Sequence, residues 1–211
     1  MTFRTAAAIA AASLALSGAV AAGTPATAAA PTSAPATPGS TSTALPDLTT
    51  LAYEVPDCEG CTIRLANVRL PEGADQPVVW QSKAKQVEDG EVRFMVAPRR
   101  TWGMSMTIET PWEGQTGYVT SVVQRYRGKA VGDRVSFKQA RKAGVASSCW
   151  AGTRSDEVRT KVVVRKVMVD GVKKKVPGTL AFTRVTQDWH DPMRRAYGGV
   201  LGTQDADICH G

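Results

Sequence analysis

Residues 167–175 read Val-Met-Val-Asp-Gly-Val-Lys-Lys-Lys. An Asp-Gly dipeptide between two β-branched runs is typical of a type I′ turn in a β-hairpin. A two-residue loop at this dipeptide would place Lys166 directly opposite Lys175, with Lys173 on the same face. Like charges that face each other across strands are mildly destabilising, and a bound polyanion would offset that cost. The stretch therefore predicts an antiparallel hairpin with a basic tip.

Alternating apolar and polar residues extend this β pattern over most of the chain. Glu88-Asp89-Gly90 predicts the turn of a second hairpin, and residues 117–126 are apolar on both faces, as expected of a central strand. Ser136 is placed to cap one short helix at residues 137–143. Further strands are predicted at 78–85, 92–96, 104–109, 158–169, 172–176 and 179–186. We therefore expect an all-β fold, an antiparallel β-sandwich of the immunoglobulin-like or prealbumin-like type.

The N-terminus has the parts of a cleavable secretory signal. Arg4 precedes an apolar run at residues 6–16, and small residues follow to Ala19-Val20-Ala21. That run is shorter than the ~20 apolar residues that span a membrane. Uncharged Ala, Thr, Pro and Ser then dominate a segment too polar to bury a core. We expect a secreted, extracellular protein without a transmembrane segment after cleavage, divided into a signal peptide (1–22), a disordered linker (23–46) and a β-sandwich domain (47–211).

Four cysteines in an exported chain are most simply two disulfides. Of the three possible pairings we favour Cys58–Cys61 and Cys149–Cys209, because the second would fasten the C-terminal tail to the body. A redox role for the first pair is disfavoured, since a strand and not a helix follows it. An oxidising compartment also disfavours zinc. We expect no cofactor and no metal.

Two segments resemble exported actinobacterial β-domain proteins of unassigned activity. They are Gln139-Ala140-Arg141 through Cys149-Trp150-Ala151-Gly152-Thr153, and Gly202-Thr203-Gln204-Asp205. The resemblance covers about the last third of the chain. The resemblance implies a β-domain protein that is exported, and it assigns no catalytic residue to this chain.

The net charge of +7 is concentrated in one block. Residues 45–120 hold 7 basic and 11 acidic side chains, whereas residues 121–175 hold 15 basic and 4 acidic ones. Lysines on a hairpin can also serve only to keep a sheet edge soluble. As anion-binding candidates we single out Arg165, Lys166, Lys173, Lys174 and Lys175 at the hairpin, together with Arg125, Arg127, Arg141 and Lys142.

These charges favour a non-enzymatic binding module for an anionic cell-wall polymer, such as teichoic acid, or for an acidic glycan. Nucleic acid is the least favoured partner, because aromatic side chains for base stacking are few in the basic block. One alternative is a cell-envelope hydrolase that uses His190 with Asp188, although a turn before Pro192 accounts for that pair as well. A purely structural or inhibitor-like protein is another. The five tryptophans, at positions 80, 102, 112, 150 and 189, could include a sugar-stacking platform, although packing is their commoner fate.

Overall fold

The computed structural model describes the residues that follow the predicted linker, with short gaps. Contacts between Cα atoms group all of these residues into one unit. The predicted signal peptide and linker, residues 1–22 and 23–46, lie outside the described residues. The described ranges are 47–113, 119–142, 144–170, 173–190, 193–196 and residue 209.

Strands dominate this part of the chain, with one short α-helix, α1 (Phe137–Lys142), and a 3₁₀ turn at Pro98–Arg100. The all-β class with one short helix is therefore confirmed. The strands are β1 (Thr49–Glu54), β2 (Thr62–Arg69), β3 (Val78–Gln81), β4 (Lys85–Gln86), β5 (Glu91–Val96), β6 (Met104–Glu109), β7 (Thr120–Ser121), β8 (Arg125–Tyr126), β9 (Val145–Ser147), β10 (Glu157–Asp170), β11 (Lys175–Thr183) and β12 (Arg194–Arg195).

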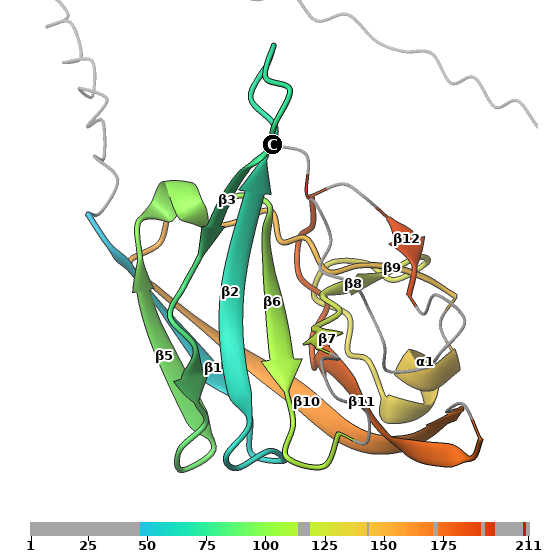
Figure 1. Cartoon of the computed structure of the whole chain (residues 1–211). Coiled ribbons are helices and arrows are strands. Elements are labelled where there is room, and N and C mark those ends of the chain that lie inside the picture. Colours follow the sequence, from blue (N-terminus) through green and yellow to red (C-terminus); the bar gives the residue numbers. More distant parts are fainter. Residues whose placement is uncertain are drawn as a thin grey trace, which may run out of the picture. The chain divides into compact units, whose positions relative to one another are not determined.

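The strands form two larger sheets and one small one (Figure 1). The first sheet has the order β11-β10-β1-β5, and the second has the order β3-β2-β6-β7 with β4 also paired to β2. The third sheet has the order β12-β9-β8. All pairs are antiparallel except β1 with β10, which are parallel and far apart in the sequence. Local turn signals could not predict that pair, because no turn joins its two strands. The immunoglobulin-like or prealbumin-like type stays a prediction.

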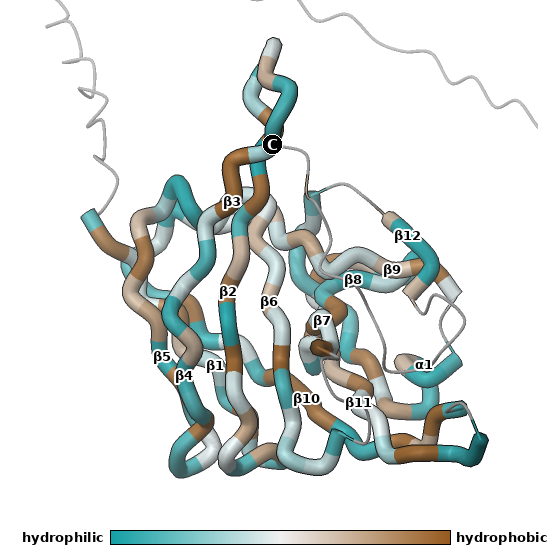
Figure 2. The backbone as a smooth tube through the Cα atoms, viewed as in Figure 1, coloured by the Kyte–Doolittle hydropathy of each residue, from teal (hydrophilic) through white to brown (hydrophobic). Residues whose placement is uncertain are grey.

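Strand β10 separates two hydrophobic cores. The first core lies between the two larger sheets and includes Leu51, Ile63 and Met106. The second lies between the β10–β11 hairpin, α1 and the third sheet. Val162 faces the first core and Val163 the second, so β10 is covered on both sides at its centre. In Figure 2 the centre of the β10–β11 hairpin is therefore apolar, whereas its end is hydrophilic.

The basic hairpin forms, but in a register different from the predicted one. Lys166 lies opposite Thr179, and Lys175 lies opposite Asp170. The predicted pairing of Lys166 with Lys175 is therefore wrong, and residues 171 and 172, which include the glycine of the predicted turn, lie outside the described residues. The observed register pairs Val169 with Val176 and packs both against the second core. Hydrophobic burial, worth ~2 kcal/mol for a valine side chain, outweighs the local preference of Asp-Gly for a two-residue turn.

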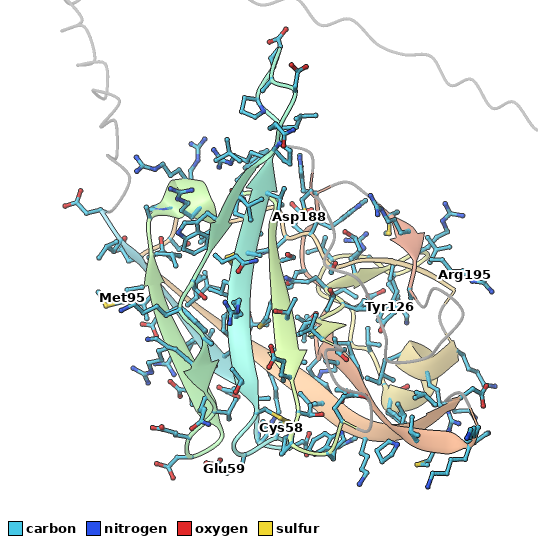
Figure 3. The ribbon with its side chains drawn as sticks, viewed as in Figure 1. Cys58, Glu59, Met95, Tyr126, Asp188 and Arg195 are labelled. Carbon is cyan, nitrogen blue, oxygen red and sulfur yellow. A yellow bond between two sulfur atoms is a disulfide. The ribbon has the colours of Figure 1, made fainter. Side chains whose placement is uncertain are left out.

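The turn at Glu88–Glu91 is confirmed, but the hairpin predicted around it is not. Asp89 and Gly90 both have positive φ, as a type I′ turn requires. After the turn β5 joins β1 in the first sheet, whereas β3 and β4 pair with β2 in the second. The turn thus links two sheets. On β5 the predicted alternation is confirmed, with Phe94 buried and Met95 pointing outward (Figure 3).

The predicted central strand at 117–126 is buried on both faces over Thr120–Gln124, as expected. It is divided into two short strands, because β7 pairs with β6 and β8 pairs with β9. Between them Val123 accepts a hydrogen bond from Thr183 and donates one to Ala181. Strand β6 is more buried than the alternation of apolar and polar residues predicts, since Ser105 is buried together with Met104 and Met106.

Both predicted disulfides are present. Cys58 pairs with Cys61 across a Cα–Cα distance of 5.5 Å, and Cys149 pairs with Cys209 across 5.8 Å. The first closes a turn between β1 and β2, where Cys58 and Glu59 lie (Figure 3).

The helix cap is confirmed and extends to a capping box. Ser136 Oγ accepts the Gln139 N–H at 3.3 Å, and Gln139 Oε1 accepts the Ser136 N–H at 2.9 Å.

Candidate anion-binding site

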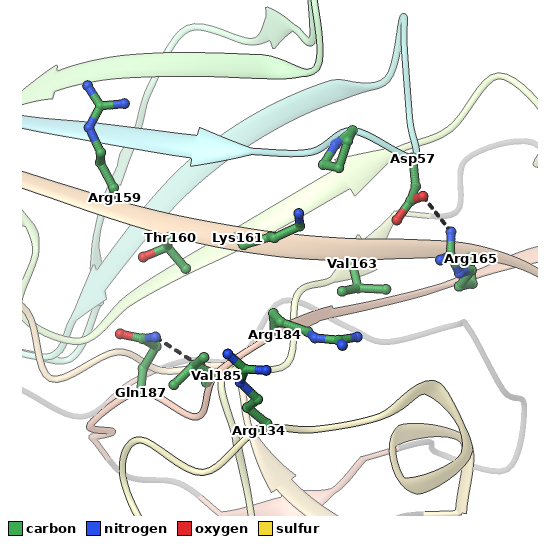
Figure 4. Close-up of a pocket in the computed structure, with 11 residues that line it drawn as sticks. Asp57, Arg134, Arg159, Thr160, Lys161, Val163, Arg165, Arg184, Val185 and Gln187 are labelled. Atoms are coloured by element: carbon green, nitrogen blue, oxygen red, sulfur yellow. Dashed lines mark hydrogen bonds and ion pairs between the residues drawn. The ribbon is translucent and has the colours of Figure 1, made fainter.

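A pocket of about 580 Å³ opens where β10 meets the segment after β11 (Figure 4). We call it the arginine pocket, because four arginines and one lysine line it together with a single carboxylate. Its lining residues are Pro56, Asp57, Arg134, Arg159, Thr160, Lys161, Val163, Arg165, Arg184, Val185 and Gln187.

Three adjacent chain segments bring the cations of the pocket together. Lys161 lies on β10, and its carbonyl accepts the Arg184 N–H at 2.8 Å. The Arg184 carbonyl accepts the Val135 N–H at 3.0 Å, and Arg134 pairs with Val185. Backbone hydrogen bonds therefore fix the order Lys161, Arg184, Arg134 across the pocket.

A tight turn positions Arg134. The Asp133 N–H donates to the Ala130 carbonyl at 3.1 Å, and the Asp133 carboxylate accepts the Ala130 N–H at 2.8 Å. Gly132, the third residue of the turn, has a φ of 90°, which a type II turn requires at that position. The sequence Ala-Val-Gly-Asp thus sets the direction in which Arg134 enters the pocket.

Two of the five cations are neutralised by neighbouring carboxylates. Arg165 Nη1 lies 2.7 Å from Asp57 Oδ1 (Figure 4), and Arg159 Nη2 lies 2.8 Å from Glu157 Oε1. Lys161, Arg134 and Arg184 form no ion pair with any residue that the structure describes. The pocket therefore keeps a local excess of positive charge.

The remaining walls supply hydrogen-bonding and apolar groups. Gln187 donates from Nε2 to the Val185 carbonyl at 2.9 Å, which fixes the orientation of its amide (Figure 4). Thr160 is buried on β10 and lies in register with Tyr53 of β1. Tyr53 is buried in the first core, and this burial raises the pKa of its hydroxyl above the ordinary value.

This arrangement is suited to binding an oxyanion. A guanidinium presents its N–H donors in a planar fork that matches carboxylate and phosphate, and Lys adds a point charge. The described lining residues of the pocket include no cysteine, histidine or serine.

The predicted anion-binding residues are divided among separate places. Arg165 alone lines the arginine pocket, where Asp57 neutralises it. The lysines are exposed. Lys173, Lys174 and Lys175 lie at the end of the β10–β11 hairpin, whereas Lys166 lies midway along the pairing of the two strands.

The remaining candidates lie near α1 and β8. Arg127 and Lys142 line a groove beside α1, and Arg141 is exposed on that helix. Arg125 Cζ lies 4.2 Å from the centre of the Trp189 ring, so a cation–π contact occupies it.

Sequence reasoning missed Arg134, Arg159, Lys161 and Arg184 as site residues. The first three belong to the basic block, so the charge count contained a signal for them. Their convergence depends on the pairing of residues 132–135 with 184–186, which no local pattern encodes.

The residues of the hydrolase alternative do not form a catalytic arrangement in the described part of the chain. The His190 ring lies 5.4 Å from the Trp102 ring, and its imidazole makes no hydrogen bond to a described carboxylate. Asp188 instead accepts the Trp189 N–H at 2.9 Å. Asp191, the other carboxylate beside His190, lies outside the described residues. All four cysteines are held in disulfides.

Among the described segments, none of the helices has the length and apolarity to cross a membrane. The resemblance to exported actinobacterial proteins stays an expectation. No family model, curated protein or solved structure matches this chain.

Proposed function

We propose that this protein is a non-enzymatic extracellular binding module for an anionic polymer, with the arginine pocket as its main contact. One observation carries the proposal: Lys161, Arg184 and Arg134 converge on one pocket without an ion pair to any described residue. Like charges gathered in one place repel, and an anionic ligand removes that cost.

The pocket supports binding of one anionic group at a time along a polymer. Its volume of about 580 Å³ lies within the range of small-ligand sites. Cell-wall teichoic acid and acidic glycans share the required chemistry, an oxyanion repeated along a flexible chain. A linear polyphosphate and a polyuronic acid are therefore the two probes that distinguish phosphate from carboxylate recognition.

The test removes two charges from the pocket and, separately, two from the hairpin. Arg134→Gln with Arg184→Gln should weaken polyanion binding roughly 30–150-fold, at about 1–1.5 kcal/mol for each contact. Lys173→Gln with Lys174→Gln removes the same charge and should change affinity less than roughly threefold. Isothermal titration calorimetry at low and physiological ionic strength measures both.

Equal losses in the two double variants would contradict the proposal, because affinity would then follow net charge alone. Binding that survives in the pocket variant but disappears in the hairpin variant would assign the function to the lysines. Thermal unfolding of both variants serves as the folding control, since Arg134, Arg184 and the two lysines are not buried.

A further inference from the structure

Trp102 has a large aromatic side chain that is exposed to solvent. It follows the 3₁₀ turn at Pro98–Arg100, and 51% of its surface is exposed. It lines a second pocket, of about 490 Å³, which we call the tryptophan pocket. The other lining residues are Arg69, Pro98, Arg99, Thr101, Ala151, Gly152, Thr153, Arg154 and Asp188. None of them lines the arginine pocket.

The backbone around Trp102 is held rigidly although the ring is exposed. The Asn67 side-chain amide donates a hydrogen bond to the Trp102 carbonyl, and Thr101 Oγ1 accepts the Thr153 N–H at 3.0 Å. Gly152 has a φ of 86°, and a Cβ there would lie 2.9 Å from the Trp102 backbone nitrogen. The segment carrying Gly152 therefore packs directly against the residue that carries the ring.

The ring itself is supported on one side. The His190 ring lies 5.4 Å from it at an interplanar angle of 57°. This contact restrains the indole and leaves about half of its surface open. A restrained, exposed aromatic ring is preorganised for stacking, because little conformational entropy remains to be lost on binding.

The polar groups around the ring are mainly cationic. Arg69 donates to the Arg99 carbonyl, which orients its guanidinium, and its Nε is buried without a hydrogen-bond partner among the described residues. Arg99 and Arg154 form no ion pair with a described residue. Asp188 supplies the one carboxylate of the pocket. An aromatic platform, several guanidinium groups and one acceptor therefore surround a single space.

We propose that the tryptophan pocket binds an acidic pyranose, a sugar ring that carries a carboxylate. The apolar C–H face of the ring would stack on Trp102, the sugar carboxylate would pair with the arginines, and a sugar hydroxyl would donate to Asp188. The site adds recognition of a sugar ring to recognition of charge. It does not depend on the arginine pocket, because the two share no residue.

The experiment uses three probes of related size. A tetrasaccharide of alternating glucuronic acid and N-acetylglucosamine carries both ring and charge. The tetramer of N-acetylglucosamine carries the ring alone, and a short polyphosphate carries charge alone. The protein should bind the acidic tetrasaccharide with at least tenfold higher affinity than the neutral one, as measured by tryptophan fluorescence and calorimetry.

Variants assign the binding to this pocket. Trp102→Ala should reduce affinity for the acidic tetrasaccharide at least tenfold, Trp102→Phe should reduce it less, and Arg154→Gln should bring it close to that of the neutral tetramer. Lys173→Gln with Lys174→Gln, which removes two charges outside both pockets, is the matched control and should leave it nearly unchanged. Because Trp102 and Arg154 are exposed, unchanged thermal unfolding of the variants is expected.

Three results would overturn this inference. Unchanged affinity in Trp102→Ala would show that the ring is not a platform, and equal affinity for the neutral tetramer would remove the acidic requirement. Tighter binding of a single-stranded oligonucleotide, again dependent on Trp102, would assign the platform to base stacking. None of these results bears on polyphosphate binding by the arginine pocket, so the two proposals fail separately.

Discussion

The two ends of β10 carry positive charge in two different ways. Near its start, Lys161 shares the arginine pocket with Arg184 and Arg134, each fixed by backbone pairing to its neighbour. Toward its far end, Lys166 and the lysines at 173–175 are exposed to water. Lys161, Arg134 and Arg184 are exposed as well, but they line one pocket together, whereas Lys166 and the lysines at 173–175 line none of the pockets described above.

The surroundings of a cation change how much it can contribute to the binding free energy of an anion. An exposed lysine is screened by solvent and salt, and holding it against a ligand costs side-chain entropy. The cations of the pocket are exposed too, but they stand on paired backbone and line one concave surface, so several of them can contact one anionic group together. Under the proposed function, the arrangement of cations, more than their number along the sequence, decides which region binds.

The strongest test of the comparison concerns the hairpin register. A Cβ at Gly178 would lie 2.8 Å from Val169 Cγ1, and valine has little rotameric freedom to move away. Gly178→Ala should lower the free energy of unfolding by about 1–2 kcal/mol, measured by urea denaturation. Gly144→Ala, where a Cβ would meet nothing within 4 Å, is the control. Combining Gly178→Ala with Val169→Ala should relieve the clash, and absence of any effect of Gly178→Ala would refute this register.

Stability at alkaline pH tests whether the hydrophobic core behind the pocket excludes water. Burial raises the pKa of Tyr53, so its proton is held more tightly in the folded than in the unfolded chain. Stability is therefore complete below pH ~10 and falls as pH rises, by about 1.4 kcal/mol at pH 11. Tyr53→Phe should remove this part of the pH dependence in denaturation series from pH 8 to 11. Identical slopes in both proteins would argue against a dry core beneath β10.

Two lysines on the same strand provide a matched pair. Lys161→Gln should weaken polyphosphate binding about fivefold, close to 1 kcal/mol, because it removes a cation that lines the arginine pocket. Lys166→Gln removes the same charge five residues along β10 and should have an effect smaller than twofold. Titration calorimetry at one ionic strength compares them. A larger loss for Lys166→Gln would reverse the comparison.

The smallest expected change in affinity comes from removing the carboxylate that pairs with Arg165. Asp57→Asn breaks the ion pair that Asp57 forms with Arg165 and should raise polyanion affinity about two- to threefold. Asp170→Asn makes the same change of charge opposite Lys175 and should leave affinity unchanged. A gain of equal size at both positions would mean that only net charge matters.

Much of the β architecture was readable from local patterns. The alternation in residues 92–96, the Asp89-Gly90 turn and the cap at Ser136 depend on neighbours in sequence, and the structure confirms them. The pairing of Cys149 with Cys209 was one of only three ways to join four cysteines in an exported chain.

The site could not be predicted in the same way. Arg184 lies outside the basic block, and the pairing that brings Arg134 beside it spans about 50 residues. The hairpin shows why local signals fail at this point: a turn preference worth a few tenths of a kcal/mol yields to the packing of Val169 and Val176 against the second core.

The sequence alone determined the strand class and the concentration of positive charge, because each depends on composition or on spacing along the chain. It favoured the disulfide pairing among three possibilities, and the structure shows that pairing. Only the tertiary structure decided the parallel contact of β1 with β10, the register of the hairpin and the convergence of Lys161, Arg184 and Arg134. Those features depend on which distant surfaces bury one another, and hydrophobic burial is non-directional, so it leaves no local trace in the order of residues.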